Sequence, residues 1–90
     1  MQLLVHIDLA GADLEAFEAY EAAVLPLLAD HGGEVLQRLR GVDRLAETHL
    51  LGFPSRQAYE AYLADPRRTR LFEQRAATGM LSEAWEVRAV

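Results

Sequence analysis

The sequence predicts an α+β domain in which helices cover one face of a four-stranded antiparallel sheet. Three observations predict it. Residues 3–9 alternate apolar and polar side chains as a strand does, and residues 14–31 repeat apolar side chains at helical spacing. The run Phe53-Pro54-Ser55 then ends a strand and begins a helix. We expect residues 1–90 to form this single domain.

The first strand and the helix after it are separated by a short break. One face of the strand is fully apolar and carries Leu3, Val5, Ile7 and Leu9. Asp13 can accept hydrogen bonds from the free backbone amides of the helix, which is expected to run to about His31. The glycines at 32–33 are expected to stop it.

The second and third strands are expected to form an antiparallel hairpin. They span residues 34–40 and 45–53, and the connection at 41–43 is short enough for a hairpin turn. Regular alternation over the second strand would place Val35, Gln37 and Leu39 on one face, and Leu36, Arg38 and Arg40 on the other.

Two helices are expected between the third and last strands. Pro54 removes a donor from the sheet and Ser55 can cap the first helix. Asp65-Pro66 places a carboxylate at a cap and a proline at the first helical position, so a second helix is expected to start there and to end near Gly79.

Residues 83–90 are expected to supply the last strand, which completes a split βαβ, ferredoxin-like arrangement with an extra short helix. One face of its sheet is left without helices. A chain of 90 residues without cysteine buries only about 60–65% of its unfolded surface and has no disulfide to compensate. We therefore expect a homodimer that pairs through the open sheet face.

Composition excludes several classes of function. A net charge of −5 disfavours nucleic acid, and the cluster of Arg67, Arg68, Arg70 and Arg75 is interpreted as a solvated helix face with ion pairs. There is no lysine, so Schiff-base chemistry and a Walker-type phosphate loop are excluded. No long apolar run or leader pattern is present, so we expect a cytoplasmic protein that does not enter the membrane.

The chain resembles the dimeric α+β barrel superfamily, and most closely a small-protein branch of it that is largely uncharacterised. The resemblance lies in the stretch from Tyr20 to Val24-Leu25-Pro26 of the first helix, in the glycines at 32–33, and in residues 53–66. It implies a homodimer with face-to-face sheets and a cavity in each subunit. The superfamily includes cofactor-free monooxygenases, lactone isomerases, cyclases, haem-handling enzymes and proteins with no known reaction, so the fold alone does not choose an activity. Cofactor-free oxygenases of this fold often use asparagine with tryptophan and histidine, and this chain has no asparagine.

His6 and Asp8 are the candidate catalytic pair. They share the less apolar face of the first strand, and a histidine beside a carboxylate can transfer protons. The alternative is that Asp8 caps a turn at the strand end.

Arg38, His49 and Trp85 are the candidate substrate-binding residues. An arginine facing a closed interior needs an anion, although Arg38 could instead pair with Glu47 or Glu86. His49 faces either the barrel or the helices, and its parity with Phe53 favours packing under the helices. Trp85 suits an interface or a core more often than a substrate platform.

The three histidines have no recognisable ligand spacing, so we expect no metal, and we expect no cofactor. Three functions remain open. The first is binding or transformation of a small organic molecule by acid–base chemistry. The others are a non-catalytic dimeric binding or regulatory module and a cofactor-free monooxygenase.

Overall fold

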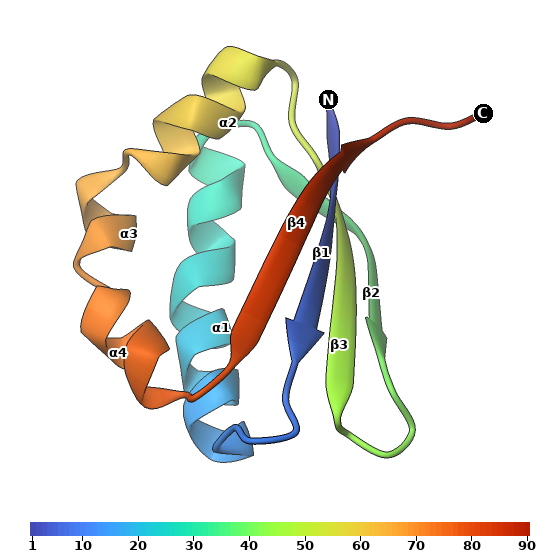
Figure 1. Cartoon of the computed structure of the whole chain (residues 1–90). Coiled ribbons are helices and arrows are strands. Elements are labelled where there is room, and N and C mark those ends of the chain that lie inside the picture. Colours follow the sequence, from blue (N-terminus) through green and yellow to red (C-terminus); the bar gives the residue numbers. More distant parts are fainter.

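The computed structural model describes residues 1–90 as a sheet of four strands with the helices on one side (Figure 1). The elements in chain order are β1 (Gln2–Asp8), α1 (Leu14–Asp30), β2 (Glu34–Arg40), β3 (Ala46–Gly52), α2 (Arg56–Leu63), α3 (Pro66–Thr69), α4 (Phe72–Ala77) and β4 (Leu81–Val87). The strand order is β2-β3-β1-β4 and all neighbours are antiparallel. The predicted α+β, ferredoxin-like arrangement is confirmed.

The predicted caps are confirmed in the structure. The Asp13 carboxylate accepts from the backbone amide of Ala16 at 3.1 Å and Ser55 Oγ accepts from that of Ala58 at 3.1 Å. Gly32 ends α1 with a φ of 71°, a conformation that costs glycine nothing and other residues much more. The strong local signals in the sequence therefore set the element ends where they were expected.

Asp65 joins the end of α1 to the start of α3. Its carboxylate accepts from the backbone amide of Arg67 at 2.8 Å, from Arg67 Nη2 at 2.7 Å and from His31 Nε2 at 2.8 Å. The hydrogen bonds from Arg67 and then His31 hold the pKa of Asp65 below its usual range. Asp65 therefore caps α3 and also connects this helix to the end of α1.

The helix predicted from Pro66 to Gly79 is instead two short helices. The helix α3 ends at Thr69 and α4 begins at Phe72, and between them Arg70 keeps helical backbone angles whereas Leu71 does not. Leu71, within the break, packs against the core, whereas Phe72 is exposed. The break changes the phase of α4, which also changes the direction of its one arginine, Arg75.

The prediction for the faces of β2 is wrong from Gln37 onward. A bulge between Val35 and Gln37 shifts the register, so Arg38 lies opposite His49 and Arg40 opposite Glu47. Both arginines therefore lie on the helix-covered side and not with Leu36.

The last strand begins two residues before the predicted start and ends at Val87. Leu81 pairs with Asp8 and Val87 pairs with Gln2, so β4 matches the full length of β1.

The core lies between the helices and the side of the sheet that they cover. Phe17 and Val24 of α1 pack with Ile7 at one end, and Leu28 packs with Leu51 at the other. None of the helices is long and apolar enough to span a membrane.

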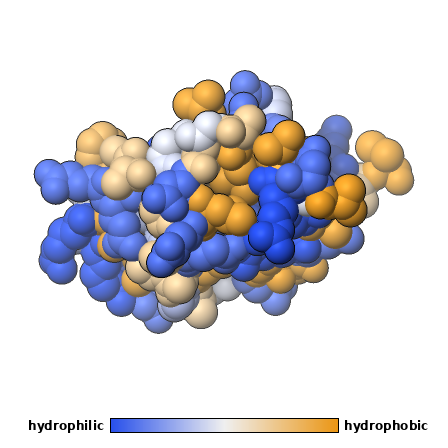
Figure 2. Space-filling view, turned by 90° about the horizontal axis from the view of Figure 1, so that it is seen from below, coloured by the Kyte–Doolittle hydropathy of each residue, from blue (hydrophilic) through white to orange (hydrophobic).

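The opposite side of the sheet, which we call the open face, has no helix over it. Its residues follow from the strand register and are Gln2, Leu4, His6 and Asp8 of β1, Glu34, Leu36, Gln37 and Leu39 of β2, Ala46, Thr48, Leu50 and Gly52 of β3, and Leu81, Glu83, Trp85 and Val87 of β4. Viewed from below, the surface shows separate apolar groups among mostly hydrophilic ones (Figure 2).

Candidate functional site

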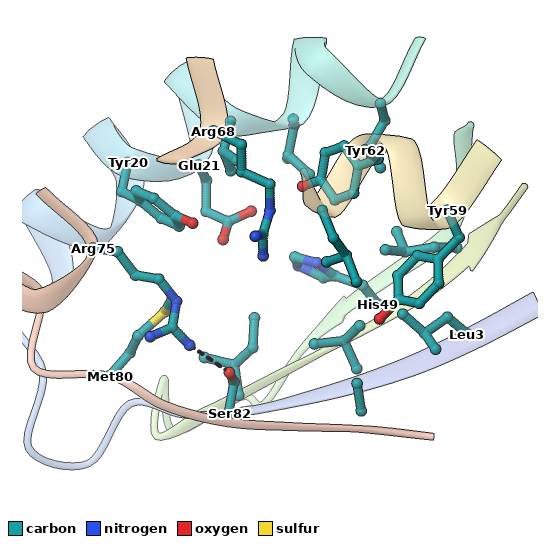
Figure 3. Close-up of a pocket in the computed structure, with 18 residues that line it drawn as sticks. Leu3, Tyr20, Glu21, His49, Tyr59, Tyr62, Arg68, Arg75, Met80 and Ser82 are labelled. Atoms are coloured by element: carbon teal, nitrogen blue, oxygen red, sulfur yellow. Dashed lines mark hydrogen bonds between the residues drawn. The ribbon is translucent and has the colours of Figure 1, made fainter. Parts of the chain in front are cut away.

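A cavity of about 150 Å³ lies between the helix-covered side of the sheet and the helices (Figure 3). Thirteen of the eighteen residues that line it are hydrophobic, so it suits a largely apolar guest. It opens over β4, where the lining residues Ser82 and Ala84 are exposed. Polar atoms come from three of the thirteen hydrophobic residues, the tyrosines Tyr20, Tyr59 and Tyr62, and from the other five residues, which are Glu21, His49, Arg68, Arg75 and Ser82.

Glu21 is the buried carboxyl group of this cavity. It lies on the core-facing side of α1 between Phe17 and Val24 and is only 5% exposed. Its Oε2 atom has no hydrogen-bond partner. Burial raises the pKa of Glu21 to about 7, although the nearby charge of Arg38 opposes the shift. Near neutral pH this group can therefore either accept or donate a proton.

His49 enters the cavity from β3 and is held by a neighbouring carboxylate. Its Nε2 lies 3.1 Å from Glu47 Oε1, and both side chains are buried. Burial lowers the pKa of His49, and the hydrogen bond to Glu47 only partly offsets this effect, so the ring is neutral at neutral pH. Because a carboxylate can only accept, we assign the ring proton to Nε2, which leaves Nδ1 as the acceptor.

Glu47 is held in turn by two arginines. Arg38 Nε donates to Glu47 Oε1 and Arg40 Nη2 donates to Oε2 at 3.0 Å. Burial works to raise the pKa of Glu47, but the hydrogen bonds from Arg38, His49 and Arg40 outweigh it and hold that pKa below its usual range. The carboxylate therefore stays charged and keeps the His49 ring in one orientation.

Tyrosine and arginine side chains form the wall opposite the sheet. The Arg68 guanidinium carbon lies 5.1 Å from the centre of the Tyr62 ring. Burial raises the pKa of both Tyr20 and Tyr62, so their hydroxyls stay protonated at neutral pH. Arg75 Nη2 donates to Ser82 Oγ at 2.7 Å across the mouth of the cavity. Figure 3 shows Arg68 and Glu21 extending into the same space from different helices.

His6 and Asp8, the predicted catalytic pair, lie on the open face, away from this cavity. Both side chains are exposed, and no hydrogen bond joins them. Asp8 Oδ1 accepts from the backbone amide of Ala10 at 2.9 Å, which is the turn cap considered as the alternative. His6 and Arg38 lie on opposite sides of the sheet and do not converge on one site. A catalytic role for the pair stays a prediction.

The three predicted substrate-binding residues are also separated. His49 lines the cavity under the helices, on the face that its parity with Phe53 favoured. Arg38 lies beside the cavity, and its Nε donates a hydrogen bond to Glu47. Trp85 lies on the open face and is 47% exposed. No group of three or more His, Asp or Glu side chains is placed to hold a metal ion.

Two functional candidates were missed in the sequence, for different reasons. Glu21 is in phase with Phe17, Val24 and Leu28, and a carboxyl group in an apolar helical stripe is a readable signal of a buried acid. Arg68 was interpreted as part of a solvated helix face. That interpretation is wrong for Arg68, because its side chain extends from α3 into the cavity.

The chain matches no family model, and no curated protein matches it significantly. Several solved structures share its fold. SnoaB from Streptomyces nogalater, described as a cofactor-independent oxygenase, is 18% identical over 99% of this chain and 94% of its own, with a TM-score of 0.74. A NIPSNAP domain protein from Burkholderia xenovorans is 13% identical over 99% and 96%, with a TM-score of 0.68.

A third similar structure is the RPA0582 protein of unknown function from Rhodopseudomonas palustris. It is 16% identical over 99% of this chain and 84% of its own, with a TM-score of 0.70. At such low identity these similarities show the fold and not an activity. The fold is the ferredoxin-like α+β fold of the barrel proteins, as the resemblance implied.

Proposed function

We propose that the cavity binds a small, largely apolar organic molecule and that Glu21 transfers a proton to or from it. The single observation that carries this proposal is a buried carboxyl group with a free oxygen in the wall of a cavity. A pKa of about 7 is suited to general acid–base catalysis near neutral pH. The neutral His49 ring, held by Glu47, supplies a hydrogen-bond acceptor in the same space.

The volume of the cavity limits the size of the guest. Apolar protein cavities of about 150 Å³ can hold one benzene ring, which matches the volume of this one. Tyrosine rings in the lining offer flat surfaces for stacking. We therefore propose a guest with a single ring.

Deuterium exchange into cyclohexanone tests the acid–base part of the proposal. In the expected reaction the Glu21 carboxylate takes a proton from the carbon beside the carbonyl, the electron pair of that C–H bond forms the enolate, and a deuteron from solvent returns. We expect the wild-type protein in D2O to accelerate the exchange above the buffer rate, as followed by proton NMR. Glu21→Gln should lose the acceleration because glutamine cannot accept the proton.

Glu60→Gln is the matched control, since Glu60 is exposed on α2 and outside the cavity. It should exchange as fast as the wild type. Equal rates for wild type and Glu21→Gln would contradict the role of Glu21. Ring binding without any accelerated exchange would instead support the non-catalytic binding module.

We do not extend the oxygenase activity of SnoaB to this chain. The shared fold at 18% identity does not carry an activity. In addition, the only tryptophan, Trp85, lies on the open face and does not line the cavity.

We also propose that two copies of the chain pair through the open face. Only 17 of the 90 residues are buried in one copy, which is a small core. Large apolar side chains are left on the open face, where Leu39 is 54% exposed and Trp85 is 47% exposed. A second copy offers the same apolar surface and would cover both sets at once.

The charge variant Leu39→Glu tests this pairing. We expect light scattering after size exclusion to give the wild type about twice the 10.0 kDa mass of one chain, and to give Leu39→Glu the mass of one chain. Carboxylates buried at a sheet-to-sheet interface without partners oppose association. Val42→Glu, at the exposed turn between β2 and β3, should leave the mass unchanged. A monomeric wild type, or a dimeric Leu39→Glu, would rule out this interface.

A further inference from the structure

Two arginines line the cavity without a carboxylate partner. Arg38, Arg40, Arg56 and Arg67 each form ion pairs, but no carboxylate lies within ion-pair distance of Arg68 or Arg75. The Nε of Arg68 is buried and donates to no acceptor in the chain. A buried donor without an acceptor is unfavourable, and a charged one especially so. The site thus lacks an acceptor that a ligand could supply.

The same two arginines stand between the cavity and a second hollow. This outer hollow, of about 210 Å³, is lined by Tyr20, Arg68, Thr69, Phe72 and Arg75. Tyr20, Arg68 and Arg75 line both spaces, so cations mark the boundary between an apolar interior and an outer space. Arg68 belongs to α3 and Arg75 to α4, so residues of both short helices meet at this boundary.

We infer that Arg68 and Arg75 form an anion-binding subsite, and that the ligand of the cavity is a one-ring organic carboxylic acid. Its ring would lie among the apolar lining and its carboxylate would accept from the two guanidinium groups. This inference rests on the proposed function, because it names the class of molecule that occupies the same cavity.

A carboxylate fits the subsite better than a bare inorganic anion. The planar guanidinium group donates two parallel hydrogen bonds that match the two oxygens of a carboxylate. A bare anion would leave the apolar cavity behind it empty, whereas a ring attached to the carboxylate fills that cavity. Arg75 already donates one N–H to Ser82, which leaves its other donors for the ligand.

Benzoate and its neutral relative benzamide test the inference, with binding measured by isothermal titration calorimetry. A pH of about 6 is suitable because most Glu21 is then protonated and does not repel the anion. We expect the wild type to bind benzoate at least about tenfold more tightly than benzamide, as one or two charge-assisted hydrogen bonds allow. Arg68→Gln should remove most of this preference, and Arg75→Gln should reduce it.

Arg70→Gln is the matched control, because Arg70 lies between the same short helices, is exposed, and lines neither space. It should keep the preference for benzoate, and circular dichroism should show all three variants folded. Equal binding of benzoate and benzamide by the wild type would overturn the anion subsite and leave the cavity proposal standing. No binding of either would overturn both proposals. Acetate binding as tightly as benzoate would overturn the assignment to a ring-bearing acid.

Discussion

Replacing Glu21 with glutamine is expected to raise the free energy of unfolding by about 3 kcal/mol near pH 8 and to change it little near pH 4. Burial raises the pKa of the Glu21 carboxyl from 4.5 to about 7 in the folded protein. Between these values the unfolded chain releases a proton that the folded chain keeps. The stability contributed by this group is therefore fully present below pH 4.5 and is lost as the pH rises through about 7. Glutamine does not ionise, so the variant escapes this loss.

Urea unfolding followed by far-ultraviolet circular dichroism, at several pH values and one protein concentration, measures the effect. Taking the difference between variant and wild type removes the titration of other groups such as Glu47 and Asp65. The exposed-site variant Glu60→Gln should differ from the wild type by no more than about 0.5 kcal/mol at every pH. A difference for Glu21→Gln that does not change with pH would show that the carboxyl group is not held in its neutral form.

The elements of the fold could be predicted because their ends are set by local chemistry. Asp13 and Ser55 each cap a helix through an amide three residues away, so both signals lie within a short stretch of sequence. The bulge at Leu36 could not be predicted in the same way. It depends on how β2 pairs with β3, a contact between separate segments, and the regular alternation of residues 34–40 gives no sign of it.

The candidate site was only partly predictable for a related reason. His49 could be placed by strand parity, and Glu21 could have been placed by its position in the apolar stripe of α1. The inward direction of Arg68 depends on how the short helix α3 packs against α1 and α2, which the pattern of residues 66–69 does not show. Residues whose direction depends on such tertiary packing need the structure.

His6 and Asp8 were predicted as a pair because they share one face of a strand, but a shared face does not show on which side of the sheet a cavity lies. Both residues do share one side of β1, as the alternation indicated, but the cavity lies on the other side of the sheet. The open face can carry polar residues such as these beside its apolar ones because no helix covers it, and water can reach them in one copy of the chain. The polar residues with the more informative positions are those that interrupt the apolar side, namely Glu47 and His49 on β3.

Glu47→Ala is expected to lower the free energy of unfolding by about 3 kcal/mol. The Glu47 residue is 1% exposed and accepts hydrogen bonds from Arg38, Arg40 and His49. Its loss leaves Arg38 Nε and His49 Nε2 without this acceptor, whereas Arg40 keeps its ion pair with Glu18. Removing one partner of a buried ion pair typically costs about 3–5 kcal/mol. We expect the lower end because the side chains of Arg38 and Arg40 are partly exposed, and water can replace the lost carboxylate.

Glu86→Ala is the matched comparison, since Glu86 pairs with Arg56 on an exposed part of the surface. An exposed pair is worth at most about 1 kcal/mol, so this variant should be nearly as stable as the wild type in the same urea experiment. Equal losses for the two variants would mean that burial does not strengthen the Glu47 network. A large loss for Glu47→Ala alone would show that the carboxylate which orients His49 at the cavity also holds β2 and β3 in register. The bulge, the arginines and the cavity would then be parts of one arrangement around a single buried charge.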